Sequence, residues 1–181
     1  MKRKIDVFSY AETILRELQR GILVTAKSGD KVNPMTIAWG TLGIEWGKVL
    51  FTVFVRESRF TKQLLDENPE FTINVPLGDP AKKILGVCGT KSGRDIDKVT
   101  ELNLTLEEPE VISVPGIREL PLTLECKIIY KQDQDPAAIG KEETDRFYQP
   151  DENNTFPFVG PKGDYHTAYY GEIVAAYIIE P

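Results

Sequence analysis

The sequence has few of the residues that metal binding and nucleophilic catalysis require. Its 181 residues include one histidine, His166, and two cysteines, Cys88 and Cys126. One histidine cannot form a histidine metal cluster, and no cysteine or carboxylate stands at metal-ligand spacing from it, so no metal site is predicted. Two cysteines are too few for a disulfide framework, which favours a reducing compartment. No nucleophile or paired general acid and base can be identified in the chain.

The sequence also lacks long apolar runs and a basic charge excess. No stretch approaches the roughly 18 consecutive apolar residues of a membrane-spanning helix. The basic segment 1–6 is not followed by an apolar segment, so no signal peptide is predicted and we expect a cytoplasmic protein without a membrane partner. The net charge of −6 argues against a nucleic-acid partner, because phosphate contacts need a basic face. The length suits one well-buried domain over residues 1–181.

The charge is distributed unevenly along the chain. Residues 21–98 contain 11 basic and 9 acidic residues, whereas residues 101–152 contain 5 basic and 13 acidic residues. An anionic ligand is therefore expected on the first half of the chain.

Helices are predicted where a capping residue precedes an apolar face. Ser9 and Glu12 have the spacing of a capping box, which predicts a first helix over residues 10–20. Three further short helices are predicted: one with Ser58 as its N-cap, one from Asp79-Pro80 to about Gly86, and one over residues 95–102.

Strands are predicted from runs of β-branched and aromatic residues between turns. The six candidate strands are residues 22–26, a strand through Trp39 to Leu42, and residues 49–55, 71–75, 120–130 and 165–179. Short turns join the first three, which predicts an antiparallel meander whose closure into a barrel would remove its edges. The polar segment 132–161 predicts a long loop beside this barrel.

A cluster of donors follows the strand that ends at residue 55. Arg56, Ser58, Arg59 and Thr61 lie around the N-terminus of the predicted helix. Free backbone N–H groups, the helix dipole and planar guanidinium groups all favour a phosphate at such a position. An ordinary capped helix with exposed arginines is the alternative, and the spacing alone leaves both open.

Two more groups and the lone histidine are candidates for ligand contact. A planar ring needs a flat apolar slot, which these residues could form: Met35, Thr36, Ala38 and Trp39. The second group consists of Ser92, Gly93, Arg94 and Lys98, in which Gly93 permits close backbone approach and Lys98 can reach an anion. The alternatives are a core position for the first group, a solvated loop for the second and a structural role for His166.

Four segments together resemble a known family. These are M-T-x-A-W-G from Met35, V-R-x-S-R-x-T from Val55, C-G-T-K-S-G-R-D-I-D-K from Cys88 and H-T-A-Y-Y-G-E-I from His166. They resemble the flavin reductase-like family of FMN-binding split barrels, in particular its flavoredoxin-like branch. The resemblance implies a mostly β, antiparallel Greek-key split barrel with short peripheral helices.

The resemblance also implies where the cofactor FMN would lie. It places the phosphate around residues 56–61 and the ring and ribityl chain along residues 35–39, with Phe54 and Val55 completing the slot. It implies further ligand contacts from Ser92, Gly93 and Lys98. It places His166 near the flavin face, where a nicotinamide could dock, which makes this residue a candidate catalytic group.

The implied function is that of an FMN-binding oxidoreductase. Such a protein passes electrons from a reduced donor such as NAD(P)H through FMN to an acceptor, and the absence of a nucleophile suits a protein whose cofactor carries the chemistry. An electron carrier reduced and oxidised by partner proteins is the alternative, and a module that has lost its flavin is a third. No G-x-G-x-x-G segment locates a nicotinamide site. The family implies a homodimer, which apolar residues 51–55 would also favour if the barrel left them uncovered.

Overall fold

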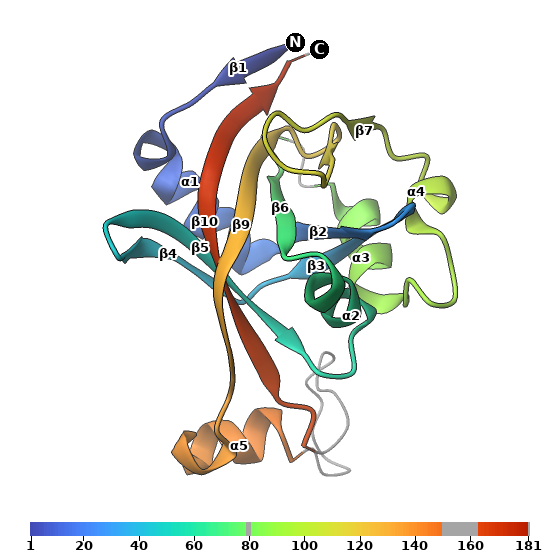
Figure 1. Ribbon diagram of the computed structural model, residues 1–181. Helices are drawn as coiled ribbons and strands as arrows, with labels where there is room; N and C mark the ends of the chain where they lie inside the picture. Colours follow the sequence, from blue (N-terminus) through green and yellow to red (C-terminus); the bar gives the residue numbers. More distant parts are fainter. Residues whose placement is uncertain (79–80, 150–162, 181) are drawn as a thin grey trace.

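The structure, a computed structural model, describes residues 1–78, 81–149 and 163–180. Within these residues the centre is one antiparallel sheet of eight strands (Figure 1). Seven of them follow the order β3-β2-β6-β9-β10-β5-β4, and β1 pairs with β10. The strands are β1 (Lys2–Lys4), β2 (Ile22–Ser28), β3 (Lys31–Ile37), β4 (Gly40–Glu45), β5 (Lys48–Arg56), β6 (Glu70–Val75), β9 (Leu122–Asp133) and β10 (His166–Ile179). The prediction of a mostly antiparallel β protein is confirmed.

At Ala38 and Trp39 the chain passes from β3, at one end of the strand order, to β4, at the other end. The prediction of one strand through Trp39 to Leu42 is wrong, because β3 ends at Ile37 and β4 begins at Gly40. β3 pairs with β2 and β4 pairs with β5, so the predicted meander is two separate hairpins. Gly40 suits this crossing, because a Cβ there would lie 2.9 Å from a carbonyl oxygen of β5. The break, together with β1, raises the predicted six strands to eight.

Short helices surround the sheet, as predicted. Among the described residues they are α1 (Ala11–Arg20), α2 (Phe60–Glu67), α3 (Lys82–Thr90), α4 (Lys98–Glu101) and α5 (Lys141–Phe147), with 3-10 turns η1 (Val7–Tyr10) and η2 (Pro136–Ala138). Figure 1 shows α2, α3 and α4 on one side of the sheet, and α5 at the end of β9 and β10 remote from the chain termini. None of the described helices is long and apolar enough to span a membrane. A small separate ladder joins β7 (Leu106–Glu107) to β8 (Gly116–Ile117).

The start of α1 differs from the predicted capping box. Ser9 lies in η1, and its hydroxyl donates to Oδ2 of Asp6 at 3.0 Å. Tyr10 is the N-cap of α1 and makes no capping hydrogen bond with its side chain. The prediction that Ser9 and Glu12 form a capping box is therefore wrong, because the Ser9 hydroxyl bonds to Asp6 in the preceding 3-10 turn.

α3 is longer than predicted. Residues 79 and 80, where its predicted start falls, lie outside the described residues. The helix continues past the predicted end at Gly86 to Thr90. Cys88, only 1% exposed, packs with Leu23 in a small apolar cluster, and this burial favours the extra turn.

Two other segments depart from their predicted extent. The helix predicted over 95–102 is the four-residue α4, which Asp97 caps by accepting from the N–H of Val99 at 3.0 Å. The segment 132–161, predicted as a loop, contains the end of β9, η2 and α5. Its residues 150–161 lie outside the described part of the chain.

A buried carboxylate fixes a long loop to the sheet. Glu125 of β9 is fully buried and accepts from the backbone N–H groups of Glu110 at 2.6 Å, Val111 at 2.8 Å and Ile112 at 3.2 Å. It also accepts from the hydroxyl of Tyr177 at 2.9 Å. These four donors replace the hydration that a buried charge would otherwise lose.

The main core lies inside the barrel, between the sheet and α1 and α2. Its residues include Phe51, Val53 and Val55 of β5, all with no exposed surface. The expectation that a small barrel would leave residues 51–55 uncovered is therefore wrong, because the helices and β10 enclose this strand. The exposed apolar side chains lie elsewhere, among them Ile44 and Trp46 at the β4–β5 turn.

Candidate functional site

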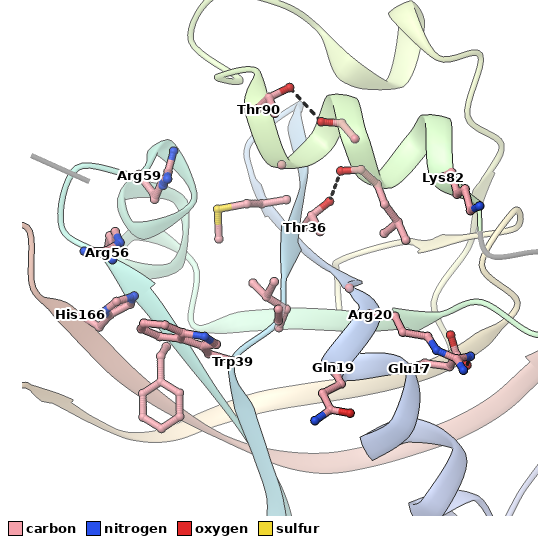
Figure 2. A pocket seen from close by; sticks show the side chains of 18 residues that line it. Glu17, Gln19, Arg20, Thr36, Trp39, Arg56, Arg59, Lys82, Thr90 and His166 are labelled. Atoms are coloured by element: carbon pink, nitrogen blue, oxygen red, sulfur yellow. Dashed lines mark hydrogen bonds and ion pairs between the residues drawn. The ribbon is translucent and has the colours of Figure 1, made fainter. Parts of the chain in front are cut away.

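A cavity of about 950 Å³ opens where the break between β3 and β4 faces α1 and α3 (Figure 2). This volume is that of a site for a small molecule or cofactor. Apolar and aromatic side chains form most of one wall, and cations lie at its ends. The cavity brings together these predicted site residues: Met35, Thr36, Ala38, Trp39, Phe54, Arg56, Arg59 and His166.

A hydrogen bond joins β3 and α3, which form two walls of the cavity. Oγ1 of Thr36 on β3 donates to the carbonyl oxygen of Leu85 on α3 at 2.7 Å, as Figure 2 shows. Ala38 is exposed and small, so the break in the strand leaves open space beside Trp39. The cavity is therefore built on fixed secondary structure at its centre.

Arg56 and Arg59 lie at one end of the cavity and differ in their hydrogen bonding (Figure 2). Arg56 is 6% exposed, and it donates to the carbonyl oxygens of Asp164 at 2.6 Å and Phe147 at 3.2 Å. Burial lowers the pKa of Arg56 from its usual value. Arg59 makes no side-chain hydrogen bond or ion pair with any described residue. Arg59 is therefore the guanidinium available to an anionic ligand.

An internal carboxylate holds two of the donors predicted to bind phosphate. Asp164 accepts the backbone N–H of Ser58 at 2.9 Å and the hydroxyl of Ser58 at 2.7 Å. The prediction that Ser58 caps α2 is wrong, because this contact turns it away and Arg59 occupies the N-cap position. A phosphate contact from Ser58 stays a prediction, and it would require Asp164 to move.

Two predicted ligand contacts lie behind the cavity wall. Val55 is fully buried in the core. Thr61 is 1% exposed, accepts from Nδ2 of Asn33 at 2.9 Å and donates to the sulfur of Met35 at 3.3 Å. Both residues support the wall that Met35 forms, and their predicted contact with a ligand is untested.

Lys98 is buried without a negative partner. It is 3% exposed, and Nζ donates to the carbonyl oxygens of Pro34 at 2.9 Å and Cys88 at 3.2 Å. No carboxylate of the described residues lies within ion-pair distance of Nζ. Burial lowers the pKa of Lys98, and the positive charge of Arg59 lowers it further. A buried cation without a counter-charge is costly, so an anion nearby would stabilise it.

Ser92 and Gly93 make structural contacts in the described residues. The hydroxyl oxygen of Ser92 accepts from the N–H of Arg94 at 3.1 Å. A Cβ at Gly93 would lie 2.1 Å from Oδ1 of Asn33, so close packing explains the glycine without a ligand. Their contact with a ligand therefore also stays a prediction.

His166 lies at the aromatic corner of the cavity. Its ring centroid is 5.0 Å from that of Trp39, and Nδ1 is 2.8 Å from the hydroxyl oxygen of Tyr148. Burial, with help from the charges of Arg56 and Arg59, lowers the pKa of His166 to about 3. The ring is therefore neutral at pH 7. Its catalytic role stays a prediction.

The far rim of the cavity was missed by sequence reasoning. It consists of Glu17 and Arg20 at the end of α1, and Lys82, Gly86 and Gly89 on α3 (Figure 2). The sequence predicted both helices but did not show which side of each faces a ligand. The two glycines three residues apart in α3 were the available signal, because they leave its backbone uncovered on one side.

The buried neutral histidine predicts a stability that depends on pH. Its pKa is lower in the folded protein than the usual 6.5, so between about pH 6.5 and 3 the unfolded chain binds one more proton. This stabilisation is complete above pH 6.5 and is lost as the pH falls. From pH 7 to pH 5 the ligand-free protein should lose roughly 2 kcal/mol more unfolding free energy than its His166→Asn variant. Urea unfolding at both pH values measures this, and equal losses would contradict it.

The fold and cavity are those of a ligand-binding antiparallel barrel, and comparison with known proteins gives the family. The profile of the flavin reductase like domain matches residues 16–181, so the chain belongs to this family. The solved structure of flavoredoxin from Methanosarcina acetivorans superposes with a TM-score of 0.64 and 24% identity, over 88% of this chain and 68% of that one. The structure of an FMN-binding domain of a flavin reductases-like enzyme from Shewanella baltica superposes with a TM-score of 0.65 and 18% identity, over 98% of this chain and 77% of that one. These likenesses confirm the split-barrel fold.

The sequence relatives are only partly covered. An uncharacterized protein of Archaeoglobus fulgidus is 34% identical over 100 residues, which are 55% of each chain. In this relative and two others, from Pyrococcus abyssi and Escherichia coli, the aligned part spans between 55% and 65% of the relative's length.

Proposed function

We propose that this chain binds FMN in the cavity and passes electrons from a reduced donor such as NAD(P)H to an acceptor. The observation that carries the proposal is a cavity that combines a largely apolar wall with Arg59 at one end, a cation that pairs with no described residue. Trp39, Ala38 and Phe54 offer the surface that a planar ring needs, and Arg59 offers a guanidinium to a phosphate. Lys98 does not line the cavity, but it donates to the carbonyl oxygen of Pro34, which directly precedes the cavity residue Met35, and its buried charge has no carboxylate partner among the described residues.

The residues present fit FMN, with some restrictions. Arg59 would hold the phosphate, and Trp39 and the small Ala38 would orient the ring. The break at residues 38 and 39 leaves backbone groups that neither hairpin pairs, and these could satisfy the polar edge of the ring. Bound FMN would supply the electron transfer that the side chains lack. Arg56 would mainly hold Phe147 and Asp164 in place through its hydrogen bonds to their carbonyl oxygens.

FMN titration tests the proposal. We expect the protein to quench FMN fluorescence with a dissociation constant in the micromolar range or below, and to become yellow on loading. The control is Ala38→Trp, which fills the cavity from an exposed position outside the core and should abolish binding while the protein stays folded. Failure of the unmodified protein to bind FMN at micromolar concentration would contradict the proposal.

The electron-carrier alternative differs in its source of electrons. An enzyme loaded with FMN should oxidise NADH or NADPH in the absence of other proteins, whereas a carrier should not. The cavity has a rim with Lys82 and Arg20, which could contact an anionic donor. This observation favours the enzyme, and stopped-flow mixing with both nucleotides distinguishes the two.

We also propose a homodimer of one-domain chains. Ile44, Trp46, Ile129 and Tyr130 are between 39% and 66% exposed, and the rings of Trp46 and Tyr130 lie 6.0 Å apart at the surface. Adjacent exposed aromatic side chains such as Trp46 and Tyr130 are typical of an interface. Light scattering should give about twice the 20.4 kDa monomer mass, and a monomer across a range of concentrations would exclude the dimer.

A further inference from the structure

Three side chains from different parts of the chain form a hydrogen-bonded chain that ends at the cavity. Oε1 of Gln134 accepts from the backbone N–H of His166 at 3.1 Å and lies 2.9 Å from the hydroxyl oxygen of Tyr148. That hydroxyl also lies 2.8 Å from Nδ1 of His166. Tyr148 and His166 are only 3% and 5% exposed, so water does not compete for these bonds.

The positions of the protons follow from one fixed donor. The backbone N–H of His166 always donates, so the atom of Gln134 that receives it must be the amide oxygen. An amide oxygen cannot donate, and Tyr148 must therefore give its single proton to Gln134. The phenol oxygen is then left to accept, and Nδ1 of His166 must carry the ring proton. The neutral imidazole consequently has an unprotonated Nε2.

This Nε2 is open to the cavity. His166 lines the cavity beside Trp39, and Figure 2 shows its ring directed toward that side chain. No described residue bonds to Nε2, and the described residues include no fully buried, unpartnered nitrogen or oxygen in a side chain. The free ring nitrogen is therefore accessible from the cavity, with a lone pair and no proton to donate.

We propose that Gln134 and Tyr148 are positioning residues that hold His166 as a hydrogen-bond acceptor for an uncharged N–H or O–H group of the molecule that exchanges electrons with the cofactor. This inference rests on the proposed function for the identity of that molecule, but the state of the ring does not depend on it. A carboxamide or a phenol matches the lone pair of Nε2. A carboxylate does not, because its oxygens and Nε2 are both acceptors.

Nitrogen-15 NMR of His166 tests the state of the ring directly, since the chain has no other histidine. In protein labelled with 15N-histidine, with and without FMN, we expect the two-bond proton–nitrogen pattern of a neutral ring protonated at Nδ1 between pH 5 and 8. A ring protonated at Nε2, or a doubly protonated ring at pH 6, would overturn the proposal. Tyr148→Phe should reduce the ratio of the Nδ1–H to the Nε2–H form by about tenfold, because Nδ1–H loses its acceptor. Tyr165→Phe is the matched control, since its hydroxyl bonds to no described residue, and it should leave the ratio unchanged.

A pair of planar probes tests recognition at Nε2. Benzamide should shift the Nε2 resonance of FMN-loaded protein saturably, with an apparent affinity at least about tenfold higher than that of benzoate. Tyr148→Phe should remove this difference, and Tyr165→Phe should retain it. Equal responses to the two probes, or a preference for benzoate, would refute acceptor recognition. FMN titration of the same samples tests the proposed function separately: a protein that does not bind FMN would contradict that function without changing the result for the protonation state of the ring.

Discussion

Replacing Arg59 with alanine is expected to weaken FMN binding by about 10- to 150-fold and to change riboflavin binding by no more than about twofold. A charge-assisted hydrogen bond typically contributes about 1.5–3 kcal/mol, and riboflavin has no phosphate to receive it. Arg59 is the appropriate target because its guanidinium lines the cavity and pairs with no described residue. Fluorescence titration of both flavins into the same variant measures the two losses.

Arg94 provides the control for this variant. It also lies beside α2, where Nη1 donates to the carbonyl oxygen of Ser58 at 3.0 Å, but it does not line the cavity. Arg94→Ala should therefore leave FMN binding nearly unchanged. Arg56 is less informative, because its loss would also free the carbonyl oxygens of Asp164 and Phe147. Equal losses of FMN and riboflavin in Arg59→Ala would show that Arg59 does not contact the phosphate.

Glu125→Gln is expected to lower the unfolding free energy by at least about 2 kcal/mol. Both carboxylate oxygens of Glu125 accept from backbone N–H groups. A glutamine would place an NH₂ group against one set of these donors, whichever way the amide is turned. Each buried donor left without an acceptor costs about 1–3 kcal/mol. Urea unfolding followed by circular dichroism measures the change.

Glu70 is the matched control on the adjacent strand. One of its oxygens accepts from the N–H and the hydroxyl of Ser113, at 2.7 and 2.6 Å, in the same loop. Glu70 is only partly buried, so water can replace a lost bond there. Glu70→Gln should cost less than half as much as Glu125→Gln. Similar costs for the two variants would show that burial of the carboxylate is not what makes Glu125 important.

The strands of the barrel could be predicted because their sequence pattern is local. The β-branched runs that became β2, β5 and β6 stand between turn residues, and each was found within a few residues of its ends. The break at Ala38 and Trp39 could not be found in this way. The alternation of apolar and polar residues continues from β3 into β4. It does not indicate that β3 pairs with β2 whereas β4 pairs with β5.

The candidate site was predictable where one segment supplies several residues. Residues 35–39, Arg56 and Arg59 meet at the cavity because they lie in or directly after β3 and β5. The contact of Asp164 with Ser58 spans 106 positions in sequence, and no local pattern identifies such a pair. The hydrogen bonds of Lys98 are likewise set by tertiary packing, since both acceptors are backbone carbonyls of other elements.

The place of β10 in the sheet constrains how the chain can be made. This strand has β9 along one edge, and β5 followed by β1 along the other. Without residues 166–179, the strands β3-β2-β6-β9 and the hairpin β5-β4 would be two sheets with unpaired inner edges. A chain emerging from the ribosome must therefore keep both edges apart from other chains until this segment has been synthesised, and premature termination before residue 166 would leave surfaces that favour aggregation.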